Sequence, residues 1–339
     1  MNDVTATLSV RNLTVTFPGD RGERVTAVDG VDFDVNPGEV LGVVGESGAG
    51  KSISVMATLG LVPPSARVTA DLIEFEGRSL LTTESRELRR IRNRRIGVVF
   101  QDPMTSLNPT FTIGYQISRT LRMFDRTMDR RRTRARVVEL LELVGIPNAA
   151  RRARQFPHEF SGGMRQRAMI AMAIANGPAL LIADEPTTAL DVTIQSQILD
   201  VLQRVAAETG AATVLITHDL GVVAETSDRV MVVYAGQVVE QAPIDAFFRE
   251  QHHFYSRALL ASLPSIDVRT ERMIPITGSP ISAAVRPSGC AFHPRCPLGR
   301  TEQICHDDEP ELLDIGARLA RCHFSSVVPT FDLEAQVAS

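Results

Sequence analysis

Lysine is almost absent from this sequence of 339 residues. Lysine and arginine together number 36, and Lys51 is the only lysine among them. Because the chain otherwise uses arginine as its cation, the one lysine marks a position that needs a compact, flexible ammonium rather than a planar guanidinium. The 36 basic and 40 acidic side chains give a net charge of −4. This balance excludes a globally basic nucleic-acid-binding protein, so we expect no nucleic acid partner, and it excludes disorder driven by charge repulsion.

Long apolar runs and a secretory signal are also missing. The longest apolar stretch, residues 168–183, is interrupted by Asn176, Gly177 and Pro178, and it is shorter than the roughly 20 residues that a membrane-spanning helix needs. The first residues, MNDVTATLSV, lack the positive start and apolar run of a signal peptide. We therefore expect a cytosolic protein with no membrane span of its own, with enough hydrophobic residues for one large domain or about two ordinary ones.

Lys51 lies in a glycine-rich segment, GESGAGKS, that fits the pattern GxxxxGK[ST]. The apolar residues 40–44 before it predict a buried strand, and ISVMATLGL after it predicts a helix. In that context the glycines let backbone amides turn toward phosphate oxygens, the lysine reaches the β and γ phosphates, and the serine can ligate Mg²⁺. We interpret the segment as a nucleotide phosphate loop rather than an ordinary turn. Its candidate binding residues are Gly45, Glu46, Ser47, Gly48, Ala49, Gly50, Lys51 and Ser52.

Two adjacent carboxylates follow a second apolar segment. Residues 179–183, ALLIA, predict a buried strand, and Asp184 and Glu185 come directly after it. An acid at the end of such a strand can hold Mg²⁺ through water, and the next acid can polarise a water molecule for attack on a γ phosphate. We therefore predict that Asp184 binds the metal and that Glu185 is the catalytic base.

A third segment, FSGGMRQR at residues 160–167, precedes an Ala- and Met-rich stretch with helical character. Ser161, Gly162 and Gly163 would open that helix, where free amides and a hydroxyl form a phosphate-binding surface. Taken alone, Ser-Gly-Gly is also typical of an ordinary helix start. Its function is therefore inferred only together with the phosphate loop and the Asp184–Glu185 segment.

Together these segments resemble the ATP-binding subunits of ABC transporters. FSGGM is similar to the signature of that family, usually written LSGGQ, with Phe160 in place of leucine and Met164 in place of glutamine. Gln101 in VVFQDP resembles the Q-loop, ALD at residues 189–191 the D-loop, and His218 in LITHDL the switch histidine. Within the family, VVGESGAGKS, FQDPMTSLNP, ADEPTTALDVTIQSQIL and GCAFHPRCP resemble the subunits that energise uptake of oligopeptides, dipeptides or nickel.

The resemblance implies an α/β fold, a P-loop NTPase of the ABC type, in which two nucleotide domains close head to tail over ATP and Mg²⁺. Each ATP would lie between the phosphate loop of one subunit and the signature of the other, so the residues Ser161, Gly162 and Gly163 would serve the partner's ATP. Gln101 would contact Mg²⁺ or the attacking water. His218 would hold the γ phosphate and orient that water.

The resemblance also implies an adenine platform and a set of partners. Family members place an aromatic residue near Phe17, and a ring face can stack on a purine. The alternation of Leu13, Val15 and Phe17 fits a half-buried strand residue equally well. The implied partners are a second ABC ATPase subunit, usually a related but different chain, two transmembrane permease subunits, and an extracytoplasmic substrate-binding protein. The subunit would then lie peripherally on the cytoplasmic face of the cell membrane.

The predicted domain organisation follows from these segments. Residues 1–250 form the nucleotide-binding domain, with a helical subdomain at about residues 105–160, and residues 251–339 form a small C-terminal extension. The stretch HFYS, which begins at His253, resembles the HPYT motif near which this extension begins in peptide-uptake subunits, with Phe254 in place of proline.

All four cysteines lie in the extension, at Cys290, Cys296, Cys305 and Cys322, with spacings Cx5C, Cx8C and Cx16C. Stable disulfides are not expected in a reducing cytosol, whereas a shared metal explains why thiols gather in one proline-rich segment. We predict a [4Fe–4S] cluster, because the sequence has no CxxC knuckle of the kind that zinc sites favour. Nearby histidines keep a mixed Cys/His Zn²⁺ site open, and four thiols without metal are the remaining alternative.

The sequence therefore predicts an ATPase that powers import of oligopeptides or dipeptides across the cytoplasmic membrane, as the nucleotide-binding subunit of an ABC importer. Uptake of nickel or another small solute by the same mechanism is an alternative, because the cargo is selected by other subunits. A soluble iron–sulfur ABC ATPase that senses redox state is a second alternative. An ABC protein of DNA repair or translation fits less well, since this chain has one phosphate loop and no heptad repeats.

Overall fold

The computed structural model describes residues 5–19, 22–188, 190–262, 276–281 and 285–330. The chain divides into two compact units, each assembled from segments that are distant in the sequence. The first unit comprises residues 1–8, 35–40 and 74–216, and the second comprises residues 9–34, 41–73 and 217–339. Both units combine strands with helices, which confirms the predicted α/β class.

Regular structure is distributed along the whole described chain. The strands are β1 (Leu8–Pro18), β2 (Arg24–Val35), β3 (Val40–Val44), β4 (Arg67–Thr69), β5 (Leu72–Phe75), β6 (Arg78–Ser79), β7 (Ile96–Val99), β8 (Leu180–Asp184), β9 (Ala212–Ile216), β10 (Arg229–Tyr234), β11 (Gln237–Pro243), β12 (Leu313–Asp314) and β13 (Leu319–Ala320). The helices are α1 (Lys51–Thr58), α2 (Ser85–Arg95), α3 (Pro103–Ser106), α4 (Ile113–Phe124), α5 (Arg130–Leu143), α6 (Ala149–Arg152), α7 (Gly162–Ala173), α8 (Val192–Thr209), α9 (Leu220–Thr226), α10 (Ile244–Arg249), α11 (Phe254–Ala261) and α12 (Gln303–Asp307). Short 3₁₀ turns are η1 (Pro157–Glu159), η3 (His293–Arg295) and η4 (Val328–Thr330).

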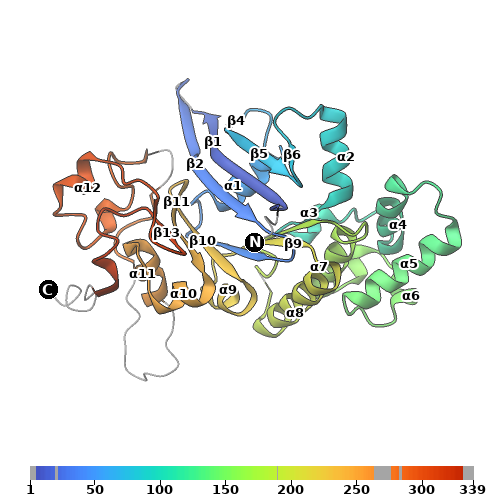
Figure 1. The fold of residues 1–339 in the computed structure, drawn as a ribbon. Helices are drawn as coiled ribbons and strands as arrows, with labels where there is room; N and C mark the ends of the chain where they lie inside the picture. The colour runs from blue at the N-terminus through green and yellow to red at the C-terminus, as the bar shows by residue number, and fades with distance from the viewer. Residues whose placement is uncertain (1–4, 20–21, 189, 263–275, 282–284, 331–339) are drawn as a thin grey trace. The chain divides into compact units, whose positions relative to one another are not determined.

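Three parallel strands carry the core of the first unit. β8 pairs with both β7 and β9, so that Ala183 lies opposite Val99 on one side and Leu215 on the other. β8 and β9 are buried almost throughout, as expected of apolar parallel strands that are covered on both faces. Between residues 103 and 159 the described regular elements are helical, and α4 and α5 pack beside each other (Figure 1).

The sheet of the second unit joins the start of the nucleotide segment to the C-terminal extension. β3 and β10 are parallel, with Val43 opposite Met231, and β11 returns antiparallel to β10. β13 pairs antiparallel with β11, where Ala320 lies opposite Glu240, and β12 pairs with β13. Strands from the extension therefore belong to the same sheet as β3, the strand that leads into residues 45–52.

An aromatic cluster fastens the extension to that sheet. The rings of Tyr234 on β10 and Tyr255 on α11 lie 4.5 Å apart, and the ring of Phe292 lies 5.2 Å from Tyr234 in an edge-on arrangement. All three side chains are fully buried, and edge-on or tilted rings at such distances attract one another beyond their buried area. Among the described residues, the extension thus shares a core with β10 instead of building one of its own.

A buried glutamate joins β11 to the start of α11. The carboxylate oxygens of Glu240 accept hydrogen bonds from the backbone N–H groups of His252, at 2.9 Å, and His253, at 3.1 Å. His253 in turn caps α11, because its Nδ1 accepts the N–H of Tyr255 at 3.0 Å. Burial raises the pKa of Glu240 to about 7 and lowers the pKa of His253 to about 3. Glu240 is therefore the member of this group that titrates near neutral pH.

We expect Glu240→Gln to flatten the dependence of stability on pH between about pH 5 and pH 8. The folded state binds this proton more tightly than the unfolded state, so the carboxyl stabilises the fold fully below its ordinary pKa of 4.5, and this stabilisation is lost as the pH rises through about 7. The difference is worth at most about 3 kcal/mol. Denaturant unfolding at a series of pH values measures it, with Glu311→Gln, at an exposed position of the extension, as the matched control. Equal pH slopes for the wild type and E240Q would contradict the assignment.

Candidate active site

The phosphate loop, residues 45–52, joins the end of β3 to the start of α1 in the second unit. Its first glycine is pressed against β10, because a Cβ on Gly45 would lie 2.2 Å from the carbonyl oxygen of Val233. A Cβ on Gly50 would lie 2.9 Å from the carbonyl oxygen of Ala27. The φ angles of Gly45 and Gly50 are +150° and +100°, values that residues with side chains rarely adopt. This course of the loop therefore requires glycine at both positions.

The single lysine of the sequence lies inside the curve of the loop. Only 5% of Lys51 is exposed, and its Nζ donates hydrogen bonds to the carbonyl oxygens of Gly45, at 2.8 Å, and Glu46, at 3.0 Å. These carbonyls compensate for the burial of the ammonium. Lys51 is thus a buried cation that two backbone carbonyls of the loop hold in place.

The remaining loop residues differ in exposure. Ser47 and Gly48 are exposed, Ala49 is buried, and Ser52 is half-buried in the first turn of α1. The carbonyl of Ala49 accepts the N–H of Gly236 at 2.8 Å, which ties the loop to the turn after β10. Because α1 begins at Lys51, the N–H groups of a helix N-terminus lie beside the loop and favour an anion there.

In the first unit, Gln101 and Glu185 meet beyond the carboxyl ends of β7 and β8. These strands are parallel, so the residues that follow them lie at the same edge of the sheet. Gln101 Nε2 donates to Oε2 of Glu185 at 3.1 Å, and the hydroxyl of Thr188 donates to the same oxygen at 2.9 Å. Asp184, the last residue of β8, directly precedes Glu185. The structure therefore brings Gln101, Asp184 and Glu185 together and adds Thr188, which sequence analysis missed although it stands in the TT pair three residues after Glu185.

Glu185 has a backbone conformation that is unusual for a residue with a side chain. Its φ angle is +45°, in the left-handed region. Its N–H donates to the carbonyl oxygen of Ile216, the last residue of β9, at 2.9 Å. Such strain persists only where the surroundings enforce it, and it is common at catalytic residues.

The signature segment, residues 160–167, opens α7 as expected. Ser161 is the N-cap, and its hydroxyl accepts the N–H of Met164 at 3.4 Å. Ser161 and Gly162 are exposed, whereas Gly163 is buried so closely against α8 that a Cβ would lie 2.7 Å from Cγ2 of Ile194. Phe160, which replaces the usual leucine, is a buried core residue. Two signature residues are thus open to solvent at a helix start.

The predicted D-loop is described in part. Ala189 lies outside the described residues, whereas Leu190 and Asp191 lie within them. Asp191 is the N-cap of α8, and its Oδ1 accepts the N–H of Ile194 at 3.0 Å.

His218 and Phe17 both belong to the second unit. The N–H of Thr217 donates to the carbonyl oxygen of Val43 at 3.1 Å, so the residue before His218 is tied to β3. His218 itself is exposed. Phe17 is half-buried near the end of β1, which fits an adenine platform and an ordinary strand residue equally well. The phosphate loop lies in this unit as well, whereas Gln101, Asp184, Glu185 and the signature lie in the first.

The four cysteines lie in a buried part of the second unit. Cys296 and Cys305 are buried, and Cys290 and Cys322 are half-buried. Burial, followed by the charges of Cys290 and Glu302, raises the pKa of Cys305 to about 11, and burial is also the main reason that the pKa values of Cys296 and Cys322 rise to about 12. The backbone N–H of Gly299 donates to Sγ of Cys296 at 3.2 Å. Burial also raises the pKa of Cys290, so burial disfavours the thiolate form of all four cysteines in this arrangement.

The arrangement does not support the predicted metal. Among the described residues, no group of three or more histidine, cysteine, aspartate or glutamate side chains is placed to hold a metal ion. The histidines that kept a zinc site open each hydrogen-bond a backbone carbonyl: His293 that of Cys290, His306 that of Arg300, and His323 that of Asp308. The cysteines nevertheless lie near one another, since the backbone N–H of Cys290 donates to the carbonyl oxygen of Cys305 at 2.9 Å.

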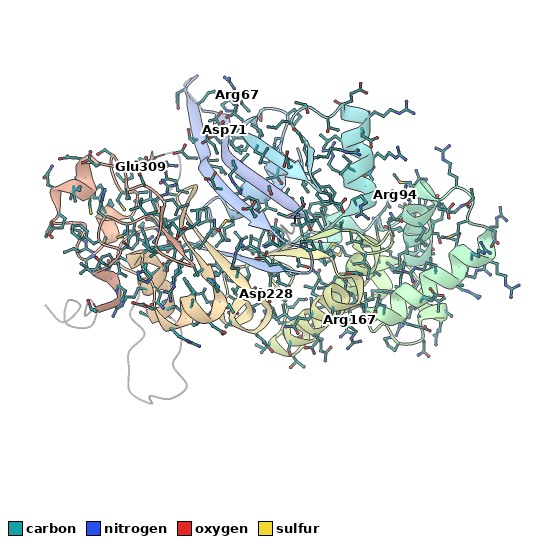
Figure 2. The ribbon with its side chains drawn as sticks, in the orientation of Figure 1. Arg67, Asp71, Arg94, Arg167, Asp228 and Glu309 are labelled. Atoms are coloured by element: carbon teal, nitrogen blue, oxygen red, sulfur yellow. The ribbon has the colours of Figure 1, made fainter. Side chains whose placement is uncertain are left out.

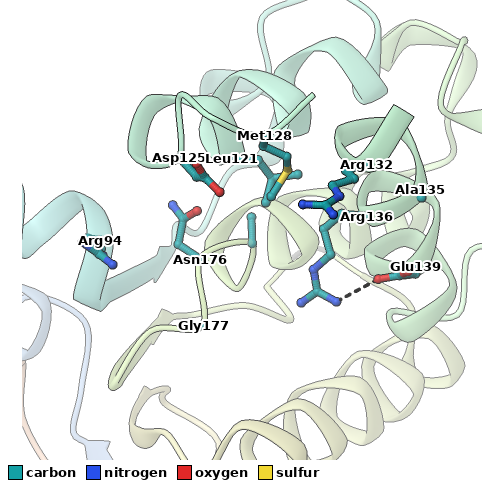
Figure 3. A pocket seen from close by; sticks show the side chains of 11 residues that line it. Arg94, Leu121, Asp125, Met128, Arg132, Ala135, Arg136, Glu139, Asn176 and Gly177 are labelled. Atoms are coloured by element: carbon teal, nitrogen blue, oxygen red, sulfur yellow. Dashed lines mark hydrogen bonds and ion pairs between the residues drawn. The ribbon is translucent and has the colours of Figure 1, made fainter. Parts of the chain in front are cut away.

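An open hollow of about 620 Å³ in the first unit is lined by none of the predicted site residues (Figure 3). Arg94, Arg132 and Arg136 contribute to its wall, and Arg136 pairs with Glu139 at 3.1 Å. Figure 2 shows Arg94 among the many charged side chains of this unit. We therefore assign the hollow no part in the nucleotide site.

Comparison with known proteins shows which family and fold the chain resembles. The family model described as ABC transporter matches residues 28–188, and the model described as oligopeptide/dipeptide transporter, C-terminal region, matches residues 239–305. The dimeric ATP-binding cassette MJ0796, solved in a post-hydrolysis state with ADP and Pi, has a TM-score of 0.62 and 29% identity, covering 70% of this chain and 98% of its own. The cassette cbiO1 from Clostridium perfringens has a TM-score of 0.61 and 26% identity, covering 72% of this chain and 90% of its own. None of the described helices is long and apolar enough to cross a membrane.

Curated relatives are closer in sequence. The dipeptide transport ATP-binding protein DppD of Haemophilus influenzae is 46% identical over 94% of this chain and 95% of its own length, and that of Escherichia coli is 45% identical over 94% and 97%. The oligopeptide transport ATP-binding protein OppD of Mycobacterium tuberculosis is 50% identical over 91% of this chain, although the chain spans only 50% of the length of that relative. The chain belongs to the ATP-binding proteins of the ABC transporter family, in the group that carries the oligopeptide/dipeptide transporter C-terminal region.

Proposed function

We propose that the protein is the nucleotide-binding subunit of an ABC importer and hydrolyses ATP to drive uptake of oligopeptides or dipeptides across the cytoplasmic membrane. The observation that carries the proposal is the glycine loop closed around the buried Lys51. This loop occurs in a chain that is 46% identical over 94% of its length to a dipeptide transport ATP-binding protein.

The phosphate loop would bind the β and γ phosphates of ATP. Its backbone N–H groups and the start of α1 supply donors, and the ammonium of Lys51 supplies the charge. Because the carbonyls of Gly45 and Glu46 already hold that ammonium, it is fixed in place before a phosphate arrives. Phe17 would offer its ring to the adenine.

The residues predicted to hold Mg²⁺ fit this ion by chemistry. Ser52 offers a hydroxyl, Asp184 a carboxylate and Gln101 an amide carbonyl, and hard oxygen atoms are the ligands that Mg²⁺ prefers. Since Gln101 uses its amide nitrogen to reach Glu185, its oxygen is the atom that would face the ion. A bound Mg²⁺ would neutralise charge that develops on the phosphates.

Glu185 would act as the general base, accepting a proton from the water that attacks the γ phosphate. Hydrogen bonds from Gln101 and Thr188 to Oε2 fix the orientation of its carboxylate. His218, exposed after β9, would contact the γ phosphate and orient the same water. Gln101 lies just before the proposed helical subdomain at about residues 105–160, and this subdomain would meet the membrane subunits.

A dimer of nucleotide subunits would complete each site. Ser161, Gly162 and Gly163 would bind the ATP held by the partner, and the exposure of Ser161 and Gly162 supports this role. The partner would be a second, related ABC ATPase. Two permease subunits would hold the pair at the cytoplasmic face of the membrane, and an extracytoplasmic binding protein would deliver cargo to them. The proposed domains are the nucleotide-binding domain at residues 1–250, with its helical subdomain at about residues 105–160, and the C-terminal extension at residues 251–339.

Transport assays separate this proposal from its alternatives. Membrane vesicles that contain the permeases and both ATPases should take up a labelled dipeptide or oligopeptide when ATP is present on the ATPase side. Uptake of Ni²⁺ or another small solute without peptide uptake would favour that solute as the transported cargo. ATPase activity that does not depend on the permeases but changes with the redox state of the thiols would favour a redox-sensing ATPase. This result would contradict the transport proposal.

We also propose that the four cysteines hold a [4Fe–4S] cluster, with Zn²⁺ as the alternative. The support is that all four cysteines of the chain lie within residues 290–322, that Cys290, Cys296 and Cys305 lie near enough to Cys322 for their charges to affect its pKa, and that backbone N–H groups donate to Sγ of Cys296 and Cys322. Because the described arrangement holds no metal-binding group, the thiols would have to draw closer on binding. No step of ATP hydrolysis is assigned to this metal.

Anaerobically purified protein should contain near-stoichiometric iron and acid-labile sulfide per chain, because four thiolates are the ligand set of such clusters. Elemental analysis and sulfide assay measure this, with zinc determined on the same sample. The double variant C290S/C296S should lose the iron and the sulfide. Protein without any of these elements would remove the metal from the proposal and leave the ATPase assignment unaffected.

Glu185→Gln should abolish turnover while leaving nucleotide binding intact. The amide can still accept hydrogen bonds from Gln101 and Thr188 but cannot accept a proton from water, so kcat should fall by about 10² to 10⁴. Phosphate release by the assembled complex and MgATP binding to the same preparation measure the two effects. Glu208→Gln, at an exposed position near the end of α8, is the matched control and should hydrolyse ATP normally. Undiminished hydrolysis in E185Q would remove Glu185 from the catalytic role.

A further inference from the structure

The C-terminal extension reaches the phosphate loop directly, at Glu46. The guanidinium of Arg295 makes two hydrogen bonds to the carboxylate of Glu46, Nη1 to Oε2 at 2.6 Å and Nη2 to Oε1 at 3.0 Å. The backbone N–H of Glu46 donates to the hydroxyl of Tyr255 on α11 at 2.7 Å. Its carbonyl oxygen accepts from Lys51 at 3.0 Å. Every polar group of Glu46 is thus engaged, two of them by the extension.

Arg295 is itself held rigidly. It lies in η3, between Cys290 and Cys296, and only 4% of it is exposed. Its Nε donates to the carbonyl oxygen of Thr277 at 2.9 Å, and its guanidinium lies 5.8 Å from the centre of the Tyr234 ring. A guanidinium in such a setting cannot follow Glu46 if the loop moves, because burial and the planar two-bond geometry fix it.

The ion pair between Arg295 and Glu46 also affects the charge that a bound phosphate would meet. A carboxylate in a loop that binds phosphates repels the ligand unless its charge is neutralised, and over these short distances solvent ions screen it weakly. Arg295 supplies the neutralising charge from the side of the loop that faces the extension. Removing one partner of a mostly buried ion pair leaves the other uncompensated, whereas removing both costs far less.

We propose that Arg295, with Tyr255, is a positioning residue for ATP, in that it neutralises Glu46 and holds the first half of the phosphate loop in the form that accepts the phosphates. The inference rests on the proposed function, since it requires that ATP binds at this loop. The short segment between Cys290 and Cys296 would then act, together with Tyr255 on α11, on the nucleotide affinity of the same chain. Any change that moves this segment would then change the affinity of the loop for ATP.

Substitutions at the ion pair test the inference in the full-length protein. We expect Arg295→Met to weaken MgATP binding by about tenfold, because Glu46 is left unneutralised beside the phosphates. The double variant R295M/E46Q should regain most of that affinity, because it carries no unpaired charge. Nucleotide titration gives the affinity, the thermal midpoint without nucleotide gives the stability, and kcat of the assembled complex should change much less than KM.

Arg321→Met is the matched control. Arg321 also directly precedes a cysteine of the extension and is largely buried, and it donates to the carbonyl oxygen of Val238 and to Glu309 without a contact to the phosphate loop. It should lower the thermal midpoint without changing MgATP affinity. If R295M does not fold, Arg295→Lys replaces it. Lysine keeps the charge and loses the paired geometry, so we expect binding about threefold weaker.

The outcomes separate the two levels of the argument. A wild-type chain that binds no MgATP would remove the proposed function, and with it the basis of the inference. A wild-type chain that binds MgATP beside an R295M or R295K variant of equal affinity would overturn the inference alone. Two other results would also overturn it. One is a loss of MgATP affinity in R321M equal to that in R295M, and the other is a double variant R295M/E46Q in which the affinity losses of the two substitutions add. Either result would mean that Arg295 only stabilises the fold in general.

Discussion

The close approach of the phosphate loop to β10 is the constraint on which the chemistry of the second unit depends. The backbone of Gly45 lies so near the carbonyl oxygen of Val233 that no side chain fits between them. This fixed start directs the next carbonyls, those of Gly45 and Glu46, toward Lys51, and they allow the one lysine of the chain to be buried with its charge. A buried ammonium beside a helix N-terminus is then prepared for a phosphate. The loop is held on its other side by the extension, through Glu46.

In the first unit, the corresponding constraint is the orientation of the Glu185 carboxylate. Parallel pairing of β7 and β8 places Gln101 and Glu185 at one edge, and two hydrogen bonds hold one carboxylate oxygen. Glu185 adopts an unfavourable left-handed backbone conformation, which places its side chain at this edge of the sheet. The hydrogen bond from its N–H to the carbonyl oxygen of Ile216 helps to hold that conformation. The signature residues, by contrast, are placed at an exposed helix start, as a contact with another subunit requires.

The parts of the site that depend on neighbouring residues could be predicted from the sequence. At the phosphate loop a strand, six connecting residues and the start of a helix follow one another, so one short segment of sequence contains all its binding residues. The same holds for the strand that ends in Asp184 and the glutamate after it. The ion pair between Glu46 and Arg295 could not be predicted in this way, because 249 residues separate its partners and no spacing relates them. The aromatic core that unites Tyr234, Tyr255 and Phe292 was missed for the same reason. For the cysteines, closeness in sequence predicts a shared metal, and the described residues contain no group of three or more side chains placed to hold one.

The most direct test of this account is a titration of the intact chain with MgATP, beside the variant Lys51→Met. The account predicts saturable binding of one MgATP per chain in the wild type. In the variant it predicts binding weaker by about tenfold or more, because a charge-assisted bond to the phosphates is lost. Equal binding by the two proteins would contradict the account, since ATP would then be held somewhere other than the loop around the single lysine.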